Sequence, residues 1–285
     1  MVSLSKKILS LEESATLAMA RKGRILKEQG REIINLSLGE PDFNTPEFIK
    51  SAAKKAIDDN FSKYTPVAGY KELLETISLK FKRDNQLTYN ASEIICSTGA
   101  KQSIAQLLMI LLDPGDEVIL PAPYWVSYHQ MIKLAGGIPK IIKTDINNDF
   151  KISPEQLEKS ITKKTKAFLF SSPCNPTGSV YNKKELIALS QVFQTHNNII
   201  IISDEIYEHI NFSTQHYSIG RIENIKNQVV TVNGLSKGYA MTGWRFGYLG
   251  GPKKIVDACN KMQGQITSAT CSITQRAAIS ALSSD

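Results

Sequence analysis

Six short apolar runs, separated by stretches of helical periodicity, constrain the fold more than any other feature of the sequence. Each run is nearly continuous in its apolarity, which suits strands that are buried on both faces of a sheet. Strands that alternate with helices predict an α/β fold with a mostly parallel sheet flanked by helices. The runs are Ile94–Ser97, Glu117–Leu120, Ile138–Ile142, Ala167–Phe170, Ile199–Ser203 and Val229–Val232, and helices are expected between them at residues 100–112, 126–135, 154–161 and 182–196.

Both ends of the chain lie outside this alternation. Pro46 favours the first turn of a helix that begins there, because proline lacks the N–H group that a first turn leaves unpaired. The other expected elements are a helix at 12–30, a strand at Ile33–Leu38, a turn at 39–45, and helices at 69–84 and 252–281. We therefore expect an N-terminal arm with a segment of a small domain at residues 1–45, and a large domain at residues 46–285.

Composition and charge argue against several classes of protein. The 285 residues are 42% hydrophobic, enough for one large core or for a large domain with a smaller one attached. No apolar run reaches the ~18 residues of a membrane span, and the start lacks a signal-peptide core, so we expect a cytoplasmic protein without a membrane partner. The net charge of +7 comes from scattered residues, which argues against nucleic acid as a partner. The four cysteines lack CxxC spacing, so no metal site or disulfide framework is expected.

The stretch after the last apolar run carries the strongest chemical signal. Ser236 and Lys237 follow a turn at Asn233-Gly234, and Arg245 lies eight residues after the lysine. In a closed site, desolvation and nearby cations push the Lys237 amine toward its neutral, nucleophilic form, while Ser236 and Arg245 can hold a phosphate. Pyridoxal phosphate needs both an amine for its aldehyde and a phosphate clamp. A surface turn with an ordinary lysine and arginine is the alternative that these residues alone leave open.

The segment from Ser236 to Arg245 resembles the lysine segment of the class I aminotransferases, the aspartate aminotransferase family of fold type I enzymes. The resemblance extends over nearly the whole chain. It implies pyridoxal 5′-phosphate as the cofactor, held as an imine by Lys237, and the large domain of that fold beside an incomplete small α+β domain. It also implies that Lys237 is the general base and acid of amino transfer.

Two more motifs lie beyond the carboxyl ends of predicted strands, where ligands bind in open α/β sheets. Gly99, Ala100 and Lys101 open a helix, so their backbone N–H groups can bind an anion. By resemblance, these three residues flank the cofactor phosphate. Trp125 can lie flat on an aromatic ring, and the family has an aromatic residue stacked on the cofactor's pyridine ring here. A position in the core is the alternative for Trp125.

The fourth and fifth apolar runs also end in motifs of the resembled family. Asn175 lies between two prolines, and we predict that the Asn175-Pro176 bond is cis. Asp204 ends a run of isoleucines, where a carboxylate is costly unless it is paired. The resemblance implies that Asn175 and Tyr207 contact the cofactor's phenolic oxygen and that Asp204 keeps its pyridine nitrogen protonated. Capping of a helix N-terminus is the alternative role for Asp204.

Tyr64 and Gly39 resemble residues that reach the ligand from other segments. Tyr64 resembles a tyrosine that contacts the phosphate from a neighbouring subunit, which implies a homodimer with shared sites. Gly39 resembles a residue whose backbone meets the substrate carboxylate, and Trp125 and Asn175 are expected to contact the substrate too. Family members continue past the position of Asp285 and supply an arginine for that carboxylate, which nothing in this sequence matches.

The expected activity is amino transfer between an L-amino acid, with aspartate as the expected donor, and a 2-oxo acid, with 2-oxoglutarate as the expected acceptor. A β-lyase or decarboxylase with the same cofactor, and a truncated chain that binds the cofactor without turnover, are the alternatives. A pyridoxal-type transcription factor would need a DNA-binding domain, for which the first 45 residues are too short. A dinucleotide-dependent dehydrogenase is disfavoured because no G-x-G-x-x-G follows the first strand and Lys237 would have no role.

Overall fold

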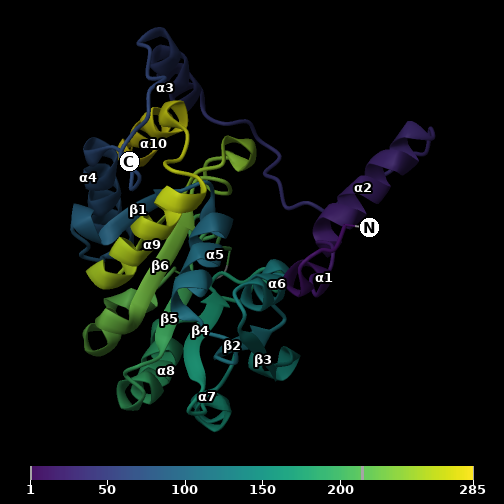
Figure 1. Cartoon of the computed structure of the whole chain (residues 1–285), viewed down its shortest axis with the longest axis vertical. Coiled ribbons are helices and arrows are strands. Elements are labelled where there is room, and N and C mark those ends of the chain that lie inside the picture. Colours follow the sequence, from purple (N-terminus) through teal and green to yellow (C-terminus); the bar gives the residue numbers. More distant parts are fainter. Residues whose placement is uncertain (1, 213–214, 285) are drawn as a thin grey trace.

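A seven-stranded sheet with helices on both sides forms the body of the computed structural model, which describes residues 2–212 and 215–284 (Figure 1). The strand order is β1-β7-β6-β5-β4-β2-β3, and every neighbouring pair is parallel except the two that include β7. The predicted mostly parallel α/β fold is therefore confirmed. The strands are β1 (Ile94–Ser97), β2 (Glu117–Ala122), β3 (Ile138–Lys143), β4 (Thr165–Ser171), β5 (Ile200–Asp204), β6 (Val229–Gly234) and β7 (Gly247–Gly250).

Strand β7 was not predicted. It is only four residues long, begins and ends with glycine, and lies antiparallel between β1 and β6. Glycine weakens a strand signal because it has no side chain to pack, so the run Gly-Tyr-Leu-Gly carries no apolar pattern. Hydrogen bonds to a neighbouring strand on each side stabilise β7, although its sequence alone does not predict a strand.

The helices follow the predicted positions with three differences, of which the first is that α1, at Lys6–Leu9, was not predicted. The predicted helix at 69–84 is α4 followed by a π-helical turn at Phe81–Asn85. The predicted helix at 252–281 is two helices, because the chain breaks at residues 267–271, where Ser268 adopts a left-handed conformation. The α-helices are α1 (Lys6–Leu9), α2 (Ala15–Glu28), α3 (Glu47–Asp58), α4 (Lys71–Lys80), α5 (Ala100–Leu111), α6 (Ser127–Leu134), α7 (Pro154–Ser160), α8 (Lys183–Thr195), α9 (Lys253–Ile266) and α10 (Ser272–Ser283).

Side chains of the central strands alternate between two cores, as the two-residue period of a strand requires. On β4, Ala167 and Leu169 pack with α5, α6 and α9, whereas Phe168 and Phe170 pack with α7 and α8. A third cluster joins β1 and β7 to α3, α4 and α10. The expectation that all six runs are buried on both faces is wrong for β3, where Ile138 and Ile141 are exposed, because β3 forms the edge of the sheet.

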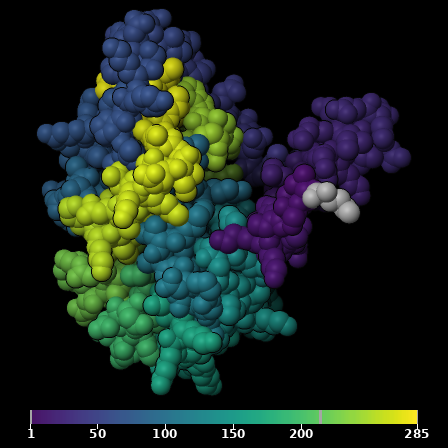
Figure 2. Space-filling view, viewed as in Figure 1, coloured from purple at the N-terminus to yellow at the C-terminus, as the bar shows by residue number. Residues whose placement is uncertain are grey.

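The N-terminal arm, α1 and α2, projects away from the body (Figure 1), and Figure 2 shows the same arm standing out from the surface. It touches α6 through a bond from Lys133 Nζ to the Ser10 carbonyl oxygen at 2.7 Å. The strand predicted at Ile33–Leu38 is absent, since these residues are irregular and Ile34 and Leu36 are about nine-tenths exposed. None of the helices in the described ranges is long and apolar enough to cross a membrane.

Gly247→Ala is expected to destabilise the protein by about 2 kcal/mol or more, because overpacking against backbone cannot be relieved by a rotamer change. A Cβ atom there would lie under 3.0 Å from backbone atoms of Gly99 and Ala100. Gly264→Ala is the control, because its Cβ would meet nothing closer than 3.7 Å and glycine is unfavourable inside helix α9. Denaturant unfolding of both variants measures the difference, and equal stability would contradict the packing argument.

Candidate active site

A cavity of about 890 Å³ opens where β2, β4, β5 and β6 end, roofed by the segment around Gly39 from the N-terminal region. The structure brings ten of the twelve sequence-predicted site residues to its walls. These are Gly39, Ala100, Lys101, Trp125, Asn175, Asp204, Tyr207, Ser236, Lys237 and Arg245.

Lys237 lies just beyond β6, on a turn closed by the bond from Met241 N–H to the Ser236 carbonyl oxygen at 3.2 Å. Its Nζ donates to the carbonyl oxygen of Gly39. Burial lowers the pKa of this amine, and the nearby Arg245 lowers it further, while Glu40 acts in the opposite direction. Lys237 is therefore not an ordinary surface lysine: its environment favours the neutral, nucleophilic amine.

An anion site lies at the start of α5, opposite the lysine. Gly99 is the residue that precedes this helix, and its φ of +86° is a conformation that suits glycine. A Cβ atom on Gly99 would lie 2.5 Å from Nη2 of Arg245, so glycine leaves room for the guanidinium in its observed position. Arg245 is itself held by a bond from Nη1 to the Thr242 carbonyl oxygen at 2.8 Å. A helix N-terminus with an adjacent guanidinium and the Ser236 hydroxyl suits a phosphate.

Lys101 and Trp125 form one wall of the cavity. Nζ of Lys101 lies 4.8 Å from the centroid of the Trp125 ring, a cation–π distance. Burial lowers the pKa of Lys101, and the neighbouring Arg245 contributes in the same direction. Trp125 is partly buried rather than enclosed in the core, and it lines the cavity.

Asp204 is the last residue of β5 and is only 4% exposed. Its Oδ2 accepts a hydrogen bond from the Tyr128 hydroxyl at 2.6 Å, and its Oδ1 accepts one from the Ile206 N–H at 3.2 Å. Burial raises the pKa of Asp204 to about 6, although both hydrogen bonds lower it. The bond to Ile206 is a turn contact of the capping kind, and the residues that follow form turns rather than a helix.

Tyr128 is a site residue that sequence reasoning missed. It is 1% exposed, donates to Asp204, and meets the Trp125 ring edge-on with centroids 5.3 Å apart. Tyr128 thus contacts both the acid and the aromatic wall of the cavity. The available signal was its spacing: Tyr128 follows Trp125 by three residues, and a turn closed by the bond from the Tyr128 N–H to the Trp125 carbonyl oxygen at 2.9 Å brings the two rings together.

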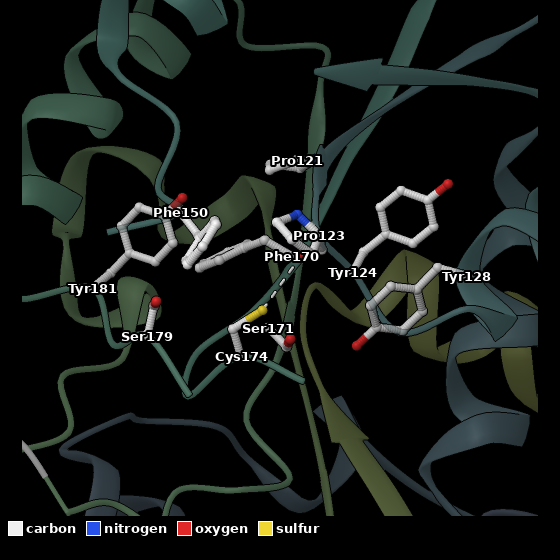
Figure 3. Close-up of a pocket in the computed structure, with 10 residues that line it drawn as sticks. All are labelled: Pro121, Pro123, Tyr124, Tyr128, Phe150, Phe170, Ser171, Cys174, Ser179 and Tyr181. Carbon is white, nitrogen blue, oxygen red and sulfur yellow. Dashed lines mark hydrogen bonds between the residues drawn. The ribbon is translucent and has the colours of Figure 1, made fainter. Parts of the chain in front are cut away.

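The side chains of Asn175 and Tyr207 meet at the cavity, where Asn175 Nδ2 donates to the Tyr207 hydroxyl at 3.3 Å. The Asn175-Pro176 bond is cis as predicted, and the Ala122-Pro123 and Ser172-Pro173 bonds are cis as well. A small pocket lies behind this loop and is drawn in Figure 3. There the Cys174 thiol points toward the Pro123 carbonyl oxygen, 3.7 Å away. Tyr124, Tyr128 and Cys174 line both this pocket and the large cavity.

Tyr64 is not brought to the cavity by its own chain. Its side chain is 99% exposed, and it does not line the cavity. Gly99 is also outside the lining, because Arg245 covers it.

Comparison with known proteins identifies the family. A model of the family described as aminotransferase class I and II matches residues 31–285. The chain belongs to the class I and II aminotransferases. A probable aspartate/prephenate aminotransferase of Rickettsia conorii is 49% identical over 98% of this chain and 70% of its own length. The aspartate aminotransferase of Geobacillus stearothermophilus is 47% identical over 99% of this chain and 72% of its own length.

Solved structures agree with this family. The aspartate aminotransferase of Thermus thermophilus, determined with maleate, superposes with a TM-score of 0.96 at 42% identity. The match covers 99% of this chain and 73% of the Thermus chain. The fold is therefore that of fold type I aminotransferases, and the protein is a pyridoxal-phosphate-dependent enzyme, as the resemblance in the sequence implied.

The residues of this aminotransferase fit its cofactor chemically. An amine whose pKa is lowered by burial suits an aldehyde, and the Arg245 guanidinium beside the N-terminus of α5 suits a phosphate. The buried carboxyl of Asp204 suits a cationic ring nitrogen. Burial removes the carboxylate from water, and a cationic partner would compensate its negative charge.

Asp204→Asn is expected to change how the stability of the cofactor-free aminotransferase depends on pH. The pKa of Asp204 is about 6 in the folded protein against an ordinary 3.8, so the folded state binds more protons between these values. The unfolding free energy of the wild type therefore falls through this window as pH rises, by about 3 kcal/mol, and the asparagine variant lacks this fall.

Denaturant titrations of wild type and variant from pH 4 to pH 8 test this expectation. A lost hydrogen bond shifts the variant equally at every pH, so only the change of the difference with pH is diagnostic. Asp58→Asn, at an exposed position of α3, is the control. Parallel profiles for wild type and Asp204→Asn would show that Asp204 ionises normally.

Proposed function

We propose that the protein transfers an amino group between L-aspartate and a 2-oxo acid, with 2-oxoglutarate as the acceptor. The observation that carries the proposal is that one cavity is lined by an amine with a lowered pKa, Lys237, a buried carboxyl, Asp204, and the guanidinium of Arg245 beside a helix N-terminus. Aspartate is favoured because relatives in Rickettsia and Geobacillus are named aspartate/prephenate and aspartate aminotransferases. The Thermus structure with maleate, a four-carbon dicarboxylate, supports the same substrate class.

Lys237 has two roles in this proposal. Its Nζ would hold pyridoxal phosphate through the cofactor's aldehyde in the resting enzyme, and it would be free while a substrate amine occupies that place. The bound cofactor supplies an electron-accepting ring for the substrate's α-carbon. The free Nζ would remove the α-proton and later return it, and burial lowers the pKa of this amine, which favours its role as a base.

The other residues hold and orient the cofactor. Asp204 would hold the ring nitrogen, because a carboxylate favours its protonated form. Asn175 and Tyr207, already hydrogen bonded to each other, would bind the phenolic oxygen. Trp125 would stack on the ring and contact the substrate together with Asn175, and the Gly39 backbone would bind the substrate carboxylate. The phosphate is held by the residues of the α5 start and the lysine turn, namely Gly99, Ala100, Lys101, Ser236 and Arg245.

The larger organisation is part of the same proposal. Residues 1–45 form an arm and a segment of a small domain, and residues 46–285 form the large domain. Two copies form a homodimer in which Tyr64 contacts the phosphate of the partner's site, which accounts for a tyrosine that is 99% exposed in one chain. A reducing compartment, the cytoplasm, suits the four cysteines, which are all free thiols.

Lys237→Ala is expected to abolish both the visible absorbance of bound cofactor and the exchange of amino groups. Borohydride treatment of the wild type should attach the cofactor irreversibly to residue 237, as peptide mapping measures. Lys261→Ala, at an exposed position of α9, should retain absorbance and exchange. Release of pyruvate or CO₂ from aspartate in place of oxo-acid exchange would mean a lyase or decarboxylase, and an unlabelled Lys237 would overturn the proposal.

Mixing Lys237→Ala with Tyr64→Ala protein is expected to restore activity that each variant lacks. In a mixed dimer, one site has an intact lysine from one chain and an intact tyrosine from the other. Since half of randomly mixed dimers are mixed and one of their two sites is whole, recovery should reach about a quarter of the wild-type activity. If Tyr64 served its own chain, or if sedimentation showed a monomer, mixing would restore nothing.

A further inference from the structure

Two carboxylates lie buried beneath the turn that carries Asp204 and Tyr207, on the side away from the cavity. Glu205 is 1% exposed, and the Glu208 side chain is 5% exposed. Neither lines the cavity, and the proposed chemistry uses neither. A buried carboxylate is costly unless it is paired and hydrogen bonded, so the contacts of these two residues define what they do.

Glu208 joins the turn to three other elements of the fold. Its Oε1 accepts from the ammonium of Lys80, the last residue of α4, which is itself 1% exposed. Asn85, at the end of the π-helical turn, donates to Oε2 and accepts from Lys80 at 2.7 Å. Asn233 of β6 donates to Oε1 at 2.7 Å. Burial raises the pKa of Glu208, but Lys80 and the other partners outweigh it, so the pKa lies below its ordinary value and the carboxylate is charged.

Glu205 anchors the same turn on another side. It accepts hydrogen bonds from the hydroxyls of Ser203 at 2.9 Å and Ser218 at 2.7 Å, and it lies 3.0 Å from Nε2 of His216. Ligand atoms of Glu205, Glu208 and His216 lie within 4.8 Å of one another, but the ammonium of Lys80 already provides a cation there. The cluster is therefore a hydrogen-bonded anchor rather than a metal site.

The bond between Glu208 and Asn233 joins two segments that both serve the cavity. Tyr207 precedes Glu208 directly, and Asn233 lies four residues before Lys237 on the strand that leads to the lysine turn. Asn233 is 1% exposed, and its Oδ1 also accepts from the Gly234 N–H at 2.7 Å. Movement of Glu208 therefore displaces the tyrosine and the lysine relative to each other.

The geometry points to Glu208 as a positioning residue that fixes Tyr207 relative to Lys237 through its hydrogen bond from Asn233. This inference rests on the proposed function of that tyrosine and lysine. Stability alone does not explain the arrangement, because replacing a buried ion pair with apolar groups of similar size is often neutral or stabilising. A link between two ligand-holding segments, by contrast, is specific to this geometry.

Two double variants distinguish the effect of the hydrogen bond between Asn233 and Glu208 from the effect of the Lys80 and Glu208 charges. Lys80→Met with Glu208→Gln removes both charges but keeps an amide oxygen that can accept from Asn233. Lys80→Met with Glu208→Met removes the charges and the acceptor. We expect the first to bind pyridoxal phosphate nearly as well as the wild type, and the second about 10- to 100-fold more weakly, the range for residues that orient other ligands.

Titration of cofactor-free protein with pyridoxal phosphate measures the affinity, and the pH midpoint of the bound cofactor's absorbance band measures the placement of the lysine and tyrosine. The pH midpoint should shift only in the variant Lys80→Met with Glu208→Met, which lacks the oxygen that accepts from Asn233. Lys253→Met with Asp257→Asn, which removes a surface ion pair of α9, should change neither quantity. Equal affinity and equal midpoints in the two double variants would overturn the inference.

Asn233→Ala cuts the same link from the other side and leaves both charges in place, so it gives a result even if a double variant does not fold. It should weaken binding by a comparable factor, and wild-type affinity would overturn the inference. Failure of the wild type to bind pyridoxal phosphate at Lys237 would instead contradict the proposed function, so the two failures are distinct.

Discussion

The site depends on a carboxyl group held at the end of a strand made of isoleucine. Asp204 is 4% exposed, and two hydrogen bonds leave its pKa at about 6, so they offset only part of the cost of burial. The cofactor-free protein therefore holds an unfavourable charge next to its cavity. In our proposal a cationic ring nitrogen supplies the missing counter-charge. The cost of burying the Asp204 charge in the free protein is then offset when the cofactor binds, which increases the affinity for the cofactor.

Two glycines determine whether the parts of the anion site can come together. Gly99 leaves the space that the Arg245 guanidinium fills, and Gly247 lets the first residue of β7 lie directly against the turn that begins α5. Arg245 adopts a left-handed conformation with φ of 54°, so its position is set by tertiary contacts rather than by preference. The short antiparallel strand is thus part of the site, although it contributes no polar side chain to it.

These features explain what the sequence could and could not predict. The parallel strands were predictable because their apolar runs are local, and the motifs at their ends lie where open sheets bind ligands. Strand β7 was not, because Gly247 and Gly250 give it no pattern and its pairing is long-range. The segment Ile33–Leu38 has a strand-like pattern but no neighbouring strand to pair with in the described chain, and pattern alone does not supply one. Tyr128 was missed because its contact with Asp204 spans 76 residues.

The turn after β5 carries two glutamates whose role the sequence does not indicate. Asp204 and Tyr207 face the cavity, so the two glutamates between and after them face the opposite side. A sequence reader expects glutamates near a strand end to be solvated, yet both are buried because Lys80, Asn233 and Ser218 lie beneath the turn. When all polar groups on one face of the turn have hydrogen-bond partners, the turn is held in place, and the side chains on its other face are restricted as well. In our proposal, the relative placement of Tyr207 and Lys237 at the cavity therefore follows from hydrogen bonds that do not contact the ligand.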